Sequence, residues 1–318
     1  MAELVTLGET MMVLTPPDQY GRIKTSGLLA KAIAGAESNV AIGVARLKHS
    51  AAWISRVGND PFGEEILYRL NGERIDTSRV KIDPSAGTGI FFKERGRGGN
   101  FQVHYYRKLS AASFLSKDDI DEDVIRQAKI LHLTGITPAL SSSCHDAVQF
   151  AIAMAKKHSV KISFDPNLRL KLWTAEAARE TLLPIIRQAD WFFPGVEEAR
   201  LLLNRESIEP DQLISAFLDM GVPQVILKLG PKGCMTANRD ERVFVKGFQV
   251  DEIDPLGAGD GFCAGYLAGV LKGWEPGECA ELANVAGALA VTGIGDYEAL
   301  PTFEEVEQFL GRKSLVSR

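Results

Sequence analysis

The sequence predicts an α/β protein whose central, mostly parallel sheet is covered by helices on both faces. Short, wholly apolar runs alternate along the chain with longer stretches in which apolar residues recur at helical spacing, a pattern typical of parallel sheets buried between helices. The 318 residues are 45% hydrophobic and 24% charged, an ordinary balance for a globular protein with a large core. No internal repeat, low-complexity tract or linker is present. We therefore expect residues 1–318 to form one domain that carries a small inserted sheet.

The candidate strands are short runs of apolar residues bounded by polar or glycine-containing segments. These runs are Leu4–Leu7, Ala52–Val57, Ile130–Thr134, Val160–Phe164, Trp191–Phe193 and Val225–Leu229. Several of them lead into polar or Gly-rich loops, among them Gly135–Thr137, Asp165–Arg169 and Gly230–Gly233. Because ligands of parallel sheets bind beyond the carboxyl ends of the strands, we expect the functional site along that edge.

Helices are expected between and after these strands, where apolar residues recur every three or four positions. The candidate helices are Ser38–Leu47, Ser142–His158, Ala175–Gln188, Pro210–Met220, Ala258–Leu271 and Cys279–Thr292. Their alternation with the strands is what predicts crossovers between parallel strands rather than hairpins.

One stretch interrupts this alternation. Thr88–Glu94 and Phe101–Arg107 are strand-like and flank a Gly-rich turn at 95–100, which is typical of a β-hairpin. We expect the hairpin to form a small sheet outside the main one, together with Met11–Leu14 and Thr25–Leu29. A lid that excludes water from a reaction is one interpretation, and an edge hairpin without a function is the other.

Composition argues against nucleic-acid, membrane and disulfide-based classes. The chain carries 36 Lys+Arg against 41 Asp+Glu, a formal net charge of −5, whereas non-specific nucleic-acid binding needs a basic surface. No window reaches the ~18 consecutive apolar residues of a spanning helix, and the first residues lack the features of a signal peptide. The four cysteines show no C-x-x-C spacing, so a disulfide framework or structural zinc site is not predicted. These observations predict a cytoplasmic protein.

The strongest local signal is the run Asp254–Phe262, in which small residues and a carboxylate open an apolar helix. Backbone amides at Gly257, Ala258 and Gly259 could approach an anion closely, and the helix dipole adds positive potential there. Such a site fits a phosphoryl group, with Asp260 as a general base for an attacking hydroxyl. A turn that needs positive φ, with Asp260 only capping the helix, is the alternative. The residues alone leave both open.

Other phosphate- and metal-binding motifs fail on inspection. No G-x-x-x-x-G-K-[ST] occurs, and Phe262 stands where a dinucleotide fingerprint would need glycine. The five histidines show no ligand spacing, and His132 lies in an apolar strand, as a core histidine would. Magnesium that arrives with a nucleotide needs few protein ligands and stays open.

Two weaker signals lie elsewhere in the chain. Gly35–Ala41 is a second helix start built of small residues, which could admit a substrate hydroxyl or could simply be a tight turn. Alternation along the hairpin places Tyr105 and Arg107 on one face and Tyr106 on the other. Tyr105 with Arg107 would suit a carboxylate, although such charges are usually solvated.

Taken together, these residues resemble the ribokinase-like (PfkB) carbohydrate kinase family over nearly the whole chain. The family's N-terminal signature is similar to Gly35–Leu47 followed by Gly58–Gly63, and its C-terminal D-T-x-G-A-G-D is similar to Asp254–Asp260. Two motifs in the correct order and at the correct separation are specific, whereas one alone would not be. The resemblance implies a ribokinase-like fold with a β lid contributed by about 11–33 and 86–108.

The resemblance also implies ATP and Mg²⁺ as cofactors. The sequence differs from the family's motifs at two positions. Pro255 stands where Thr is commoner, which bears on a monovalent-cation site such as one for K⁺. Gly195 replaces the Asn of the family's N-x-x-E, while Glu198 matches the Glu that organises magnesium through water.

Within the family, the chain is most similar to kinases of 2-keto-3-deoxygluconate, on the segments Tyr105–Arg107, Asp165–Arg169 and Gly295–Pro301. This similarity implies ATP-dependent phosphorylation of the sugar acid at its 6-hydroxyl. A fructokinase or another neutral-sugar kinase is the alternative, and a non-catalytic homologue ranks last. An exposed hairpin sheet often seeks a partner edge, so we also expect a homodimer formed through the lid.

The resemblance assigns residues to three roles. Asp260 is the base, the amides of Gly257, Ala258 and Gly259 form the anion hole, and Glu198 holds the metal through water. Around the sugar acid it places Gly35, Ala36, Glu37, Ser38, Asn39, Phe91, Tyr105, Tyr106, Arg107, Arg169, Asp260 and Asp296. Around the nucleotide it places Asn167, Leu168, Arg169, Lys228, Leu229, Gly230, Pro231, Lys232, Gly233, Gly257, Ala258, Gly259, Asp260, Asn284 and Gly287.

Selectivity is expected to follow from Arg107. If closure of the lid buries this guanidinium, a neutral sugar leaves its charge uncompensated at a cost of about 3–5 kcal/mol. That cost predicts roughly a hundredfold or greater preference for the keto-acid over fructose.

Overall fold

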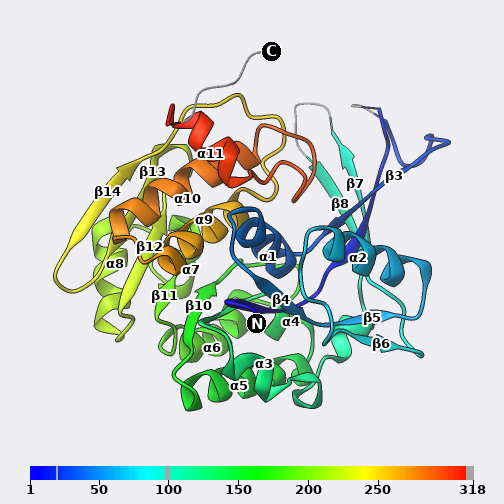
Figure 1. Ribbon diagram of the computed structural model, residues 1–318, viewed down its shortest axis with the longest axis horizontal. Helices are drawn as coiled ribbons and strands as arrows, with labels where there is room; N and C mark the ends of the chain where they lie inside the picture. The colour runs from blue at the N-terminus through cyan, green and yellow to red at the C-terminus, as the bar shows by residue number, and fades with distance from the viewer. Residues whose placement is uncertain (19–20, 97–100, 313–318) are drawn as a thin grey trace.

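The computed structural model describes residues 1–18, 21–96 and 101–312. Figure 1 shows a twisted central sheet between two groups of helices, with a small second sheet projecting at one end. Among the described residues, no helix combines the length and apolar character needed to cross a membrane.

The main sheet has eight strands in the described part of the chain. Their order is β14 (Arg242–Lys246), β13 (Gly233–Ala237), β12 (Gln224–Lys228), β11 (Trp191–Phe192), β10 (Lys161–Asp165), β9 (Ile130–Thr134), β1 (Leu4–Leu7) and β4 (Ala51–Ile54). The pairs from β12 to β4 are parallel, and β13 pairs antiparallel with both β12 and β14, so β13 alone of these eight strands runs in the opposite direction. The mostly parallel sheet that the apolar runs predict is confirmed.

One predicted strand is divided in two. The run 52–57 leaves the sheet after Ile54, and β5 (Arg56–Gly58) pairs instead with β6 (Lys81–Asp83) in a separate two-stranded sheet. The apolar run is continuous in sequence, but its backbone pairs first with β1 and then with β6.

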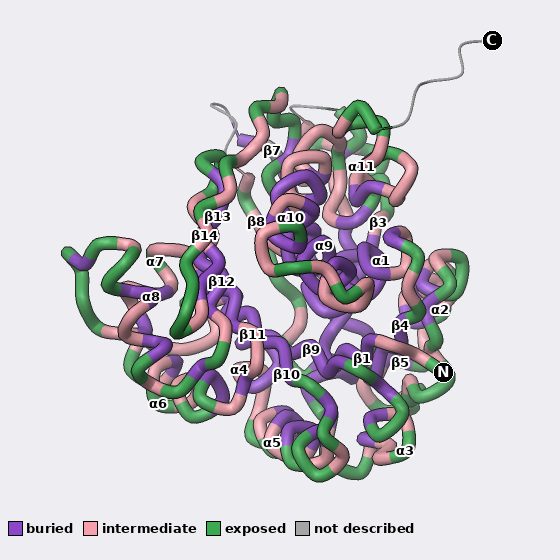
Figure 2. Tube along the Cα trace, turned by 60° about the vertical axis from the view of Figure 1, so that its left-hand side comes forward, coloured by how far each residue is buried: buried purple, intermediate pink, exposed green. Residues whose placement is uncertain are grey.

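Two helical layers cover the sheet because its strands are apolar on both faces. Val5 and Leu7 of β1 belong to one core cluster and Leu4 to the other, and in Figure 2 the buried strands lie between the helix layers. The first layer is α5 (Ser142–Lys157), α6 (Ala175–Ile186), α7 (Val196–Leu203) and α8 (Pro210–Asp219), and the second is α1 (Ala36–Arg46), α2 (Pro61–Gly72), α9 (Ala258–Lys272) and α10 (Pro276–Ala290). Three short helices, α3 (Glu122–Arg126), α4 (Thr137–Leu140) and α11 (Phe303–Phe309), complete the set among the described residues.

The small sheet has the order β3 (Ala30–Ala34), β2 (Met11–Thr15), β7 (Ile90–Arg95) and β8 (Phe101–Tyr106). We call it the lid sheet. The hairpin strands β7 and β8 and the strand β2 are as predicted, but the predicted strand 25–29 is wrong. The amides of Thr25 and Ser26 donate to the carbonyl of Arg22, so this segment forms a turn and the strand begins only at Ala30. Residues 97–100 of the predicted hairpin turn lie outside the described residues.

Asp60 ties the lid sheet to the main body. Its carboxylate caps α2 by accepting from the amides of Phe62 and Gly63, and its second oxygen accepts from the amide of Thr88 at 2.7 Å. The helix start and the beginning of the hairpin are therefore fixed by one side chain.

Candidate active site

The site lies where the start of α9 meets the start of α1 and the loop after β10. Asn39 Nδ2 donates to Asp260 Oδ2 at 2.8 Å, and Asn167 Nδ2 lies 3.5 Å from Asp260 Oδ1. The helix cap is Gly257, and Asp260 makes no capping hydrogen bond. The structure therefore excludes the interpretation in which Asp260 only caps the helix.

The loop that opens α9 requires glycine at 257. Its φ is +77°, in the left-handed region, and a Cβ there would collide with the carbonyl of Asp296. The first amides of a helix have no intrahelical acceptor, and here they belong to Ala258, Gly259 and Asp260. The fifteen-residue α9 adds its dipole. This helix start can bind an anion.

Asp260 has an electrostatic environment suited to a base. Its side chain is buried with 9% of the residue exposed, and burial raises its pKa to about 7. The hydrogen bond from Asn39 and the charge of Arg169 lower the pKa, while Asp165 and Asp296 raise it further. A carboxylate with a pKa near neutrality can both accept and release a proton at physiological pH.

The loop after β10 brings Asn167 and Arg169 to this carboxylate. Asn167 has a φ of +36°, an unusual backbone conformation that asparagine tolerates. Its backbone N–H donates to Asp165 Oδ1 at 3.0 Å. Arg169 is exposed and donates only to the carbonyl of Leu168. Within the described ranges it has no ion-pair partner, so its charge is available to a ligand.

A cavity of about 390 Å³ lies on one side of the anion-binding loop. Eight of the fifteen residues predicted to bind nucleotide line it: Lys228, Gly230, Pro231, Gly233, Ala258, Gly259, Asn284 and Gly287. Leu229 packs against the core instead, and Lys232 is exposed outside the cavity. The remaining five, Asn167, Leu168, Arg169, Gly257 and Asp260, do not line this cavity, and Asn167 contacts the Asp260 carboxylate instead.

The opposite wall of this cavity was missed by sequence reasoning. Gly247, Phe248, Gln249, Val250 and Glu252 contribute to it. They follow β14, a strand that the sequence did not predict. Asn284 holds this wall in place, because its Nδ2 donates to the carbonyls that end β14 at 3.1 and 3.3 Å.

Lys228 faces the same cavity from a buried ion pair. Its Nζ lies 2.8 Å from Asp165 Oδ2, which also accepts from Cys263 Sγ at 3.3 Å. Although burial alone would lower it, the charge of Asp165 raises the pKa of Lys228 well above its usual value. The lysine is therefore a fixed positive charge, and a Cβ on Gly259 would lie 3.8 Å from it.

A second cavity, of about 540 Å³, lies on the other side of the loop, under the lid sheet. Val13, Ala32 and Lys93 line it from the lid sheet, and Asp254 and Asp296 from the opposite loops. The segment 254–259 therefore borders both cavities, through Asp254 beneath the lid sheet and through Pro255, Ala258 and Gly259 beside α10. Of the predicted sugar-binding set, only Asp296 lines this second cavity, and burial raises its pKa to about 6.

Glu37 is not placed as predicted. Its side chain is fully buried, and Oε1 accepts from the hydroxyls of Thr134 and Thr137 at 2.7 Å each. Burial raises its pKa. As the second residue of α1, Glu37 projects beneath the helix toward the sheet, so its side chain cannot reach a ligand at the surface.

The residues next to Glu37 lie at the start of α1, where the predicted sugar-binding segment was expected. Gly35, Ala36 and Ser38 lie at the start of α1, and Ser38 Oγ is buried between Thr10 Oγ1 at 2.7 Å and the carbonyl of Gly35 at 3.0 Å. Of this segment, the Asn39 side chain is the one that touches Asp260.

The lid sheet separates the two predicted tyrosines. Tyr105 lies on the same face as Phe91, with ring centroids 5.5 Å apart, and Arg107 is over its ring at 5.7 Å. Tyr106 points to the opposite face, packs edge-on against Phe92 and is 66% exposed. Tyr106 thus lies on the other side of the lid sheet from Tyr105 and Arg107, because neighbouring residues of a strand face opposite sides, and its contact with the sugar stays a prediction.

Arg107 is already neutralised. Its Nε lies 2.7 Å from Glu9 Oε2; the Glu9 side chain is fully buried and that of Arg107 is 10% exposed. Ser110 Oγ holds the other oxygen of Glu9. The premise that a neutral sugar would leave Arg107 uncompensated is wrong, because the chain supplies its own carboxylate.

Glu198 offers one way to hold a metal. Its oxygens accept from the amides of Leu168 at 2.9 Å and Gly195 at 2.8 Å. No group of three or more His, Cys, Asp or Glu side chains in the described ranges could hold a metal ion. The residues present therefore fit a magnesium ion that is bound mainly by phosphates and water, with Glu198 accepting from one of its waters.

His132 fits its predicted place in the core. It is fully buried, its Nδ1 lies 2.8 Å from Ser163 Oγ, and burial lowers its pKa to about 4. It is neutral at physiological pH.

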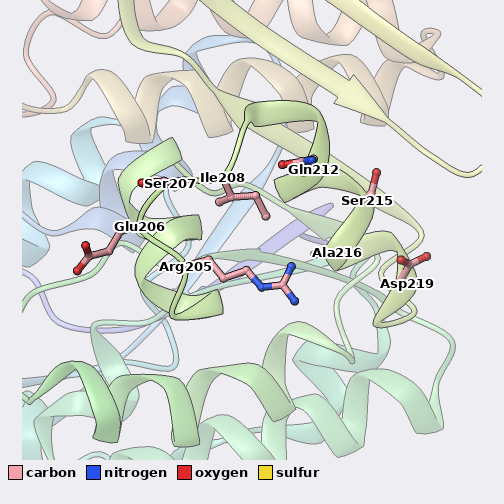
Figure 3. Close-up of a pocket in the computed structure, with 8 residues that line it drawn as sticks. All are labelled: Arg205, Glu206, Ser207, Ile208, Gln212, Ser215, Ala216 and Asp219. Atoms are coloured by element: carbon pink, nitrogen blue, oxygen red, sulfur yellow. The ribbon is translucent and has the colours of Figure 1, made fainter.

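A third concavity lies far from this chemistry. Figure 3 shows Arg205 to Ile208 in the turn between α7 and α8, facing Gln212, Ser215, Ala216 and Asp219 of α8. None of the predicted site residues is among them.

A buried carboxylate with a near-neutral pKa, an open helix start and a cavity lined by that helix start are typical of a small-molecule phosphotransferase. The pfkB family carbohydrate kinase model matches residues 1–303. The chain belongs to this family and is a carbohydrate kinase.

Among curated relatives, the chain is 38% identical over 317 residues to the 2-dehydro-3-deoxygluconokinase of Bacillus subtilis (strain 168), covering 99% of this chain and 97% of that one. It is 35% identical to the 2-dehydro-3-deoxygluconokinase of Thermoproteus tenax, covering 98% and 94%. It is also 34% identical to a chloroplast protein of Arabidopsis thaliana, probable fructokinase-6, covering 96% and 82%.

Solved structures share the fold. A 2-dehydro-3-deoxygluconokinase from Thermotoga maritima has a TM-score of 0.89 at 27% identity and 98% coverage of both chains. An E. coli protein assigned as a ribokinase II, in complex with ATP and Mg²⁺, has a TM-score of 0.91 at 29% identity, with 98% and 100% coverage. A fructokinase double mutant from Vibrio cholerae with fructose, ADP and potassium bound has a TM-score of 0.86 at 30% identity and 98% coverage of both. The ribokinase-like fold is confirmed.

Proposed function

We propose that this protein transfers the γ-phosphoryl group of ATP to the 6-hydroxyl of 2-keto-3-deoxygluconate. The observation that carries the proposal is the position of Asp260, held by Asn39 and Asn167 at the open start of α9. Two curated relatives that are 38% and 35% identical to this chain are 2-dehydro-3-deoxygluconokinases, which supports the sugar acid as substrate.

In the reaction, Asp260 accepts the proton of the attacking hydroxyl. The Asn39 amide orients the carboxylate oxygen that receives it, and the amides at the start of α9 stabilise the negative charge on the transferring group. Lys228, held by its ion pair with Asp165, presents its ammonium group as a hydrogen-bond donor on the nucleotide side.

Magnesium, when bound with the nucleotide, would neutralise charge on the phosphates, and Glu198 is the residue that would hold its water. The backbone amides of Leu168 and Gly195 keep the Glu198 carboxylate in one orientation. The nucleotide would occupy the cavity lined by Gly230, Asn284 and Gly287.

Recognition of the substrate carboxylate is assigned to Arg169. Its guanidinium is exposed beside Asp260 and has no ion-pair partner within the described ranges, whereas Arg107 is paired with Glu9. A hydrogen bond to a charged group contributes about 1.5–3 kcal/mol. The expected preference for the sugar acid is therefore roughly 10- to 100-fold, smaller than an unpaired buried Arg107 would give.

The same ion pair favours the second candidate, a neutral ketose. A sugar without a carboxylate leaves no buried charge unpaired on the lid sheet, because Glu9 already compensates Arg107. Fructokinase activity is therefore the alternative that the test must separate.

An ADP-release assay with sugar acids and neutral ketoses tests the proposal. We expect the highest kcat/KM for 2-keto-3-deoxygluconate. Arg169→Met should lower that value about 10- to 100-fold and lower the value for fructose much less, because fructose has no carboxylate. The exposed Arg187→Met at the end of α6 is the matched control. A wild-type kcat/KM for fructose equal to or above that for the keto-acid would refute the proposed substrate.

A further inference from the structure

A buried lysine of the lid sheet reaches the anion-binding loop. Lys93 of β7 has 7% of its side chain exposed, and its Nζ lies 2.6 Å from Asp254 Oδ2 and 3.8 Å from Asp296 Oδ1. The Asp254 side chain is 2% exposed and that of Asp296 15%. Residues 161 positions apart in sequence are thus joined by an ion pair that water scarcely reaches.

Both carboxylates belong to the segments that shape the anion hole. Asp254 Oδ1 accepts from the amide of Leu256 at 3.2 Å and Oδ2 from the amide of Gly295 at 3.3 Å. Leu256 directly precedes Gly257, and the carbonyl of Asp296 lies against the α-carbon of Gly257. The conformation of Gly257 therefore depends on two loops whose side chains meet at Lys93.

The charges explain why these loops need Lys93. Asp254 and Asp296 repel one another: the negative charge of Asp254 raises the pKa of Asp296. The positive charge of Lys93 lowers the same pKa. Two buried carboxylates without a counter-ion would separate or take up protons. Either change would move the backbone of the anion-binding loop.

We propose that Lys93 is a positioning residue that holds the 254–257 loop in its anion-binding conformation when the lid sheet lies against the main body. It couples the position of the lid sheet to the shape of the anion hole. The lid sheet also carries Lys31, but that lysine pairs with Glu65 at the surface and is 51% exposed. The proposal rests on the phosphotransfer role given to the loop and not on which sugar is the substrate.

The direct test is amide hydrogen exchange of Leu256, Gly261 and Gly295 in the ligand-free protein, because these amides are hydrogen-bonded to Asp254 or to the carbonyl of Gly257. Lys93→Met should accelerate exchange of these amides about tenfold or more, because the loop opens locally, while Lys93→Arg should stay near the wild type. The control is Lys161→Met, which removes an exposed lysine paired with Asp190 at 2.7 Å and should change nothing. Unchanged exchange in a folded Lys93→Met protein would overturn the proposal.

The kinetic test uses the smaller variant Lys93→Ala. Its kcat should fall about 100-fold, and ethylammonium should restore part of it by pairing with Asp254, whereas tetramethylammonium, which has the same charge but no N–H, should not. Equal effects of the two cations would contradict a role for a hydrogen-bonded counter-ion. If no sugar supports turnover, the proposed function fails, but the exchange measurement still decides the role of Lys93.

Discussion

Asp260 owes its chemistry to three neighbours that the chain brings from distant positions. Asn39 and Asn167 donate to its oxygens, and Asp165, buried beneath it, contributes a negative charge that raises its pKa. A solvated aspartate would be a weak base, whereas this one has a pKa matched to proton transfer near neutrality.

The raised pKa of Asp260 sets the pH dependence of turnover. Below about pH 7 the carboxyl is protonated in the folded enzyme and cannot accept the proton of the hydroxyl. We therefore expect kcat/KM to fall about tenfold per pH unit on the acid side of 7. Initial rates from pH 5 to 8.5 check this, and a profile that stays flat down to pH 5 would exclude Asp260 as the titrating base.

At the scale of single residues, sequence reasoning found the helix starts but not the partners of charged side chains. The anion-binding role of Gly257 to Asp260 could be predicted because the glycines, the helix start and the carboxylate all lie within a few consecutive residues. Glu9 could not, because its partner Arg107 is 98 positions away and no local pattern links a loop after β1 to the end of the lid hairpin. Glu37 was misplaced because a motif does not say which side of a helix faces the sheet.

At the scale of elements, the Glu9–Arg107 pair fastens the end of the lid hairpin to the loop after β1. Because both groups are buried, removing one leaves the other charged and unpaired. We expect Glu9→Gln and Arg107→Met each to lower the free energy of unfolding by about 3–5 kcal/mol.

The double variant distinguishes this account from simple loss of packing. Glu9→Gln combined with Arg107→Met should recover most of the lost stability, because no charge is then left unpaired. Urea unfolding of the four proteins in the cycle measures the coupling. Additive losses would show that the pair is not what fastens the hairpin.

Strands and helices were predictable to the extent that both of their faces are apolar. The parallel strands from β12 to β4 are buried except for a few residues at their ends, so their apolar runs mark them in the sequence. The antiparallel edge strand β14 alternates between exposed and half-buried residues, which gives no such run, and β3 begins with exposed residues. Because β14 was not predicted, the cavity wall at 247–252 that follows it was not predicted either.

At the scale of the whole molecule, the anion-binding loop is shared by two cavities. Pro255, Ala258 and Gly259 line the cavity beside α10, and Asp254 lines the cavity under the lid sheet. This one segment therefore borders both cavities. Movement of the lid sheet would change one cavity directly and, through Lys93, the loop itself.

The lid sheet also leaves the strands β3 and β8 at its two edges, and Tyr106 is exposed on its outer face. Unpaired edges favour pairing with a second copy. The homodimer through the lid stays a prediction, which sedimentation of the purified protein would decide.

The central claim, that Asp260 is the base of a sugar-acid kinase, is tested most directly by turnover of Asp260→Asn with 2-keto-3-deoxygluconate and ATP. The amide keeps the size of the side chain but cannot accept the proton, so kcat should fall about 10²- to 10⁴-fold. Asp146→Asn, an exposed aspartate of α5, should leave kcat unchanged. An Asp260→Asn enzyme that works within a few-fold of the wild type would contradict the account.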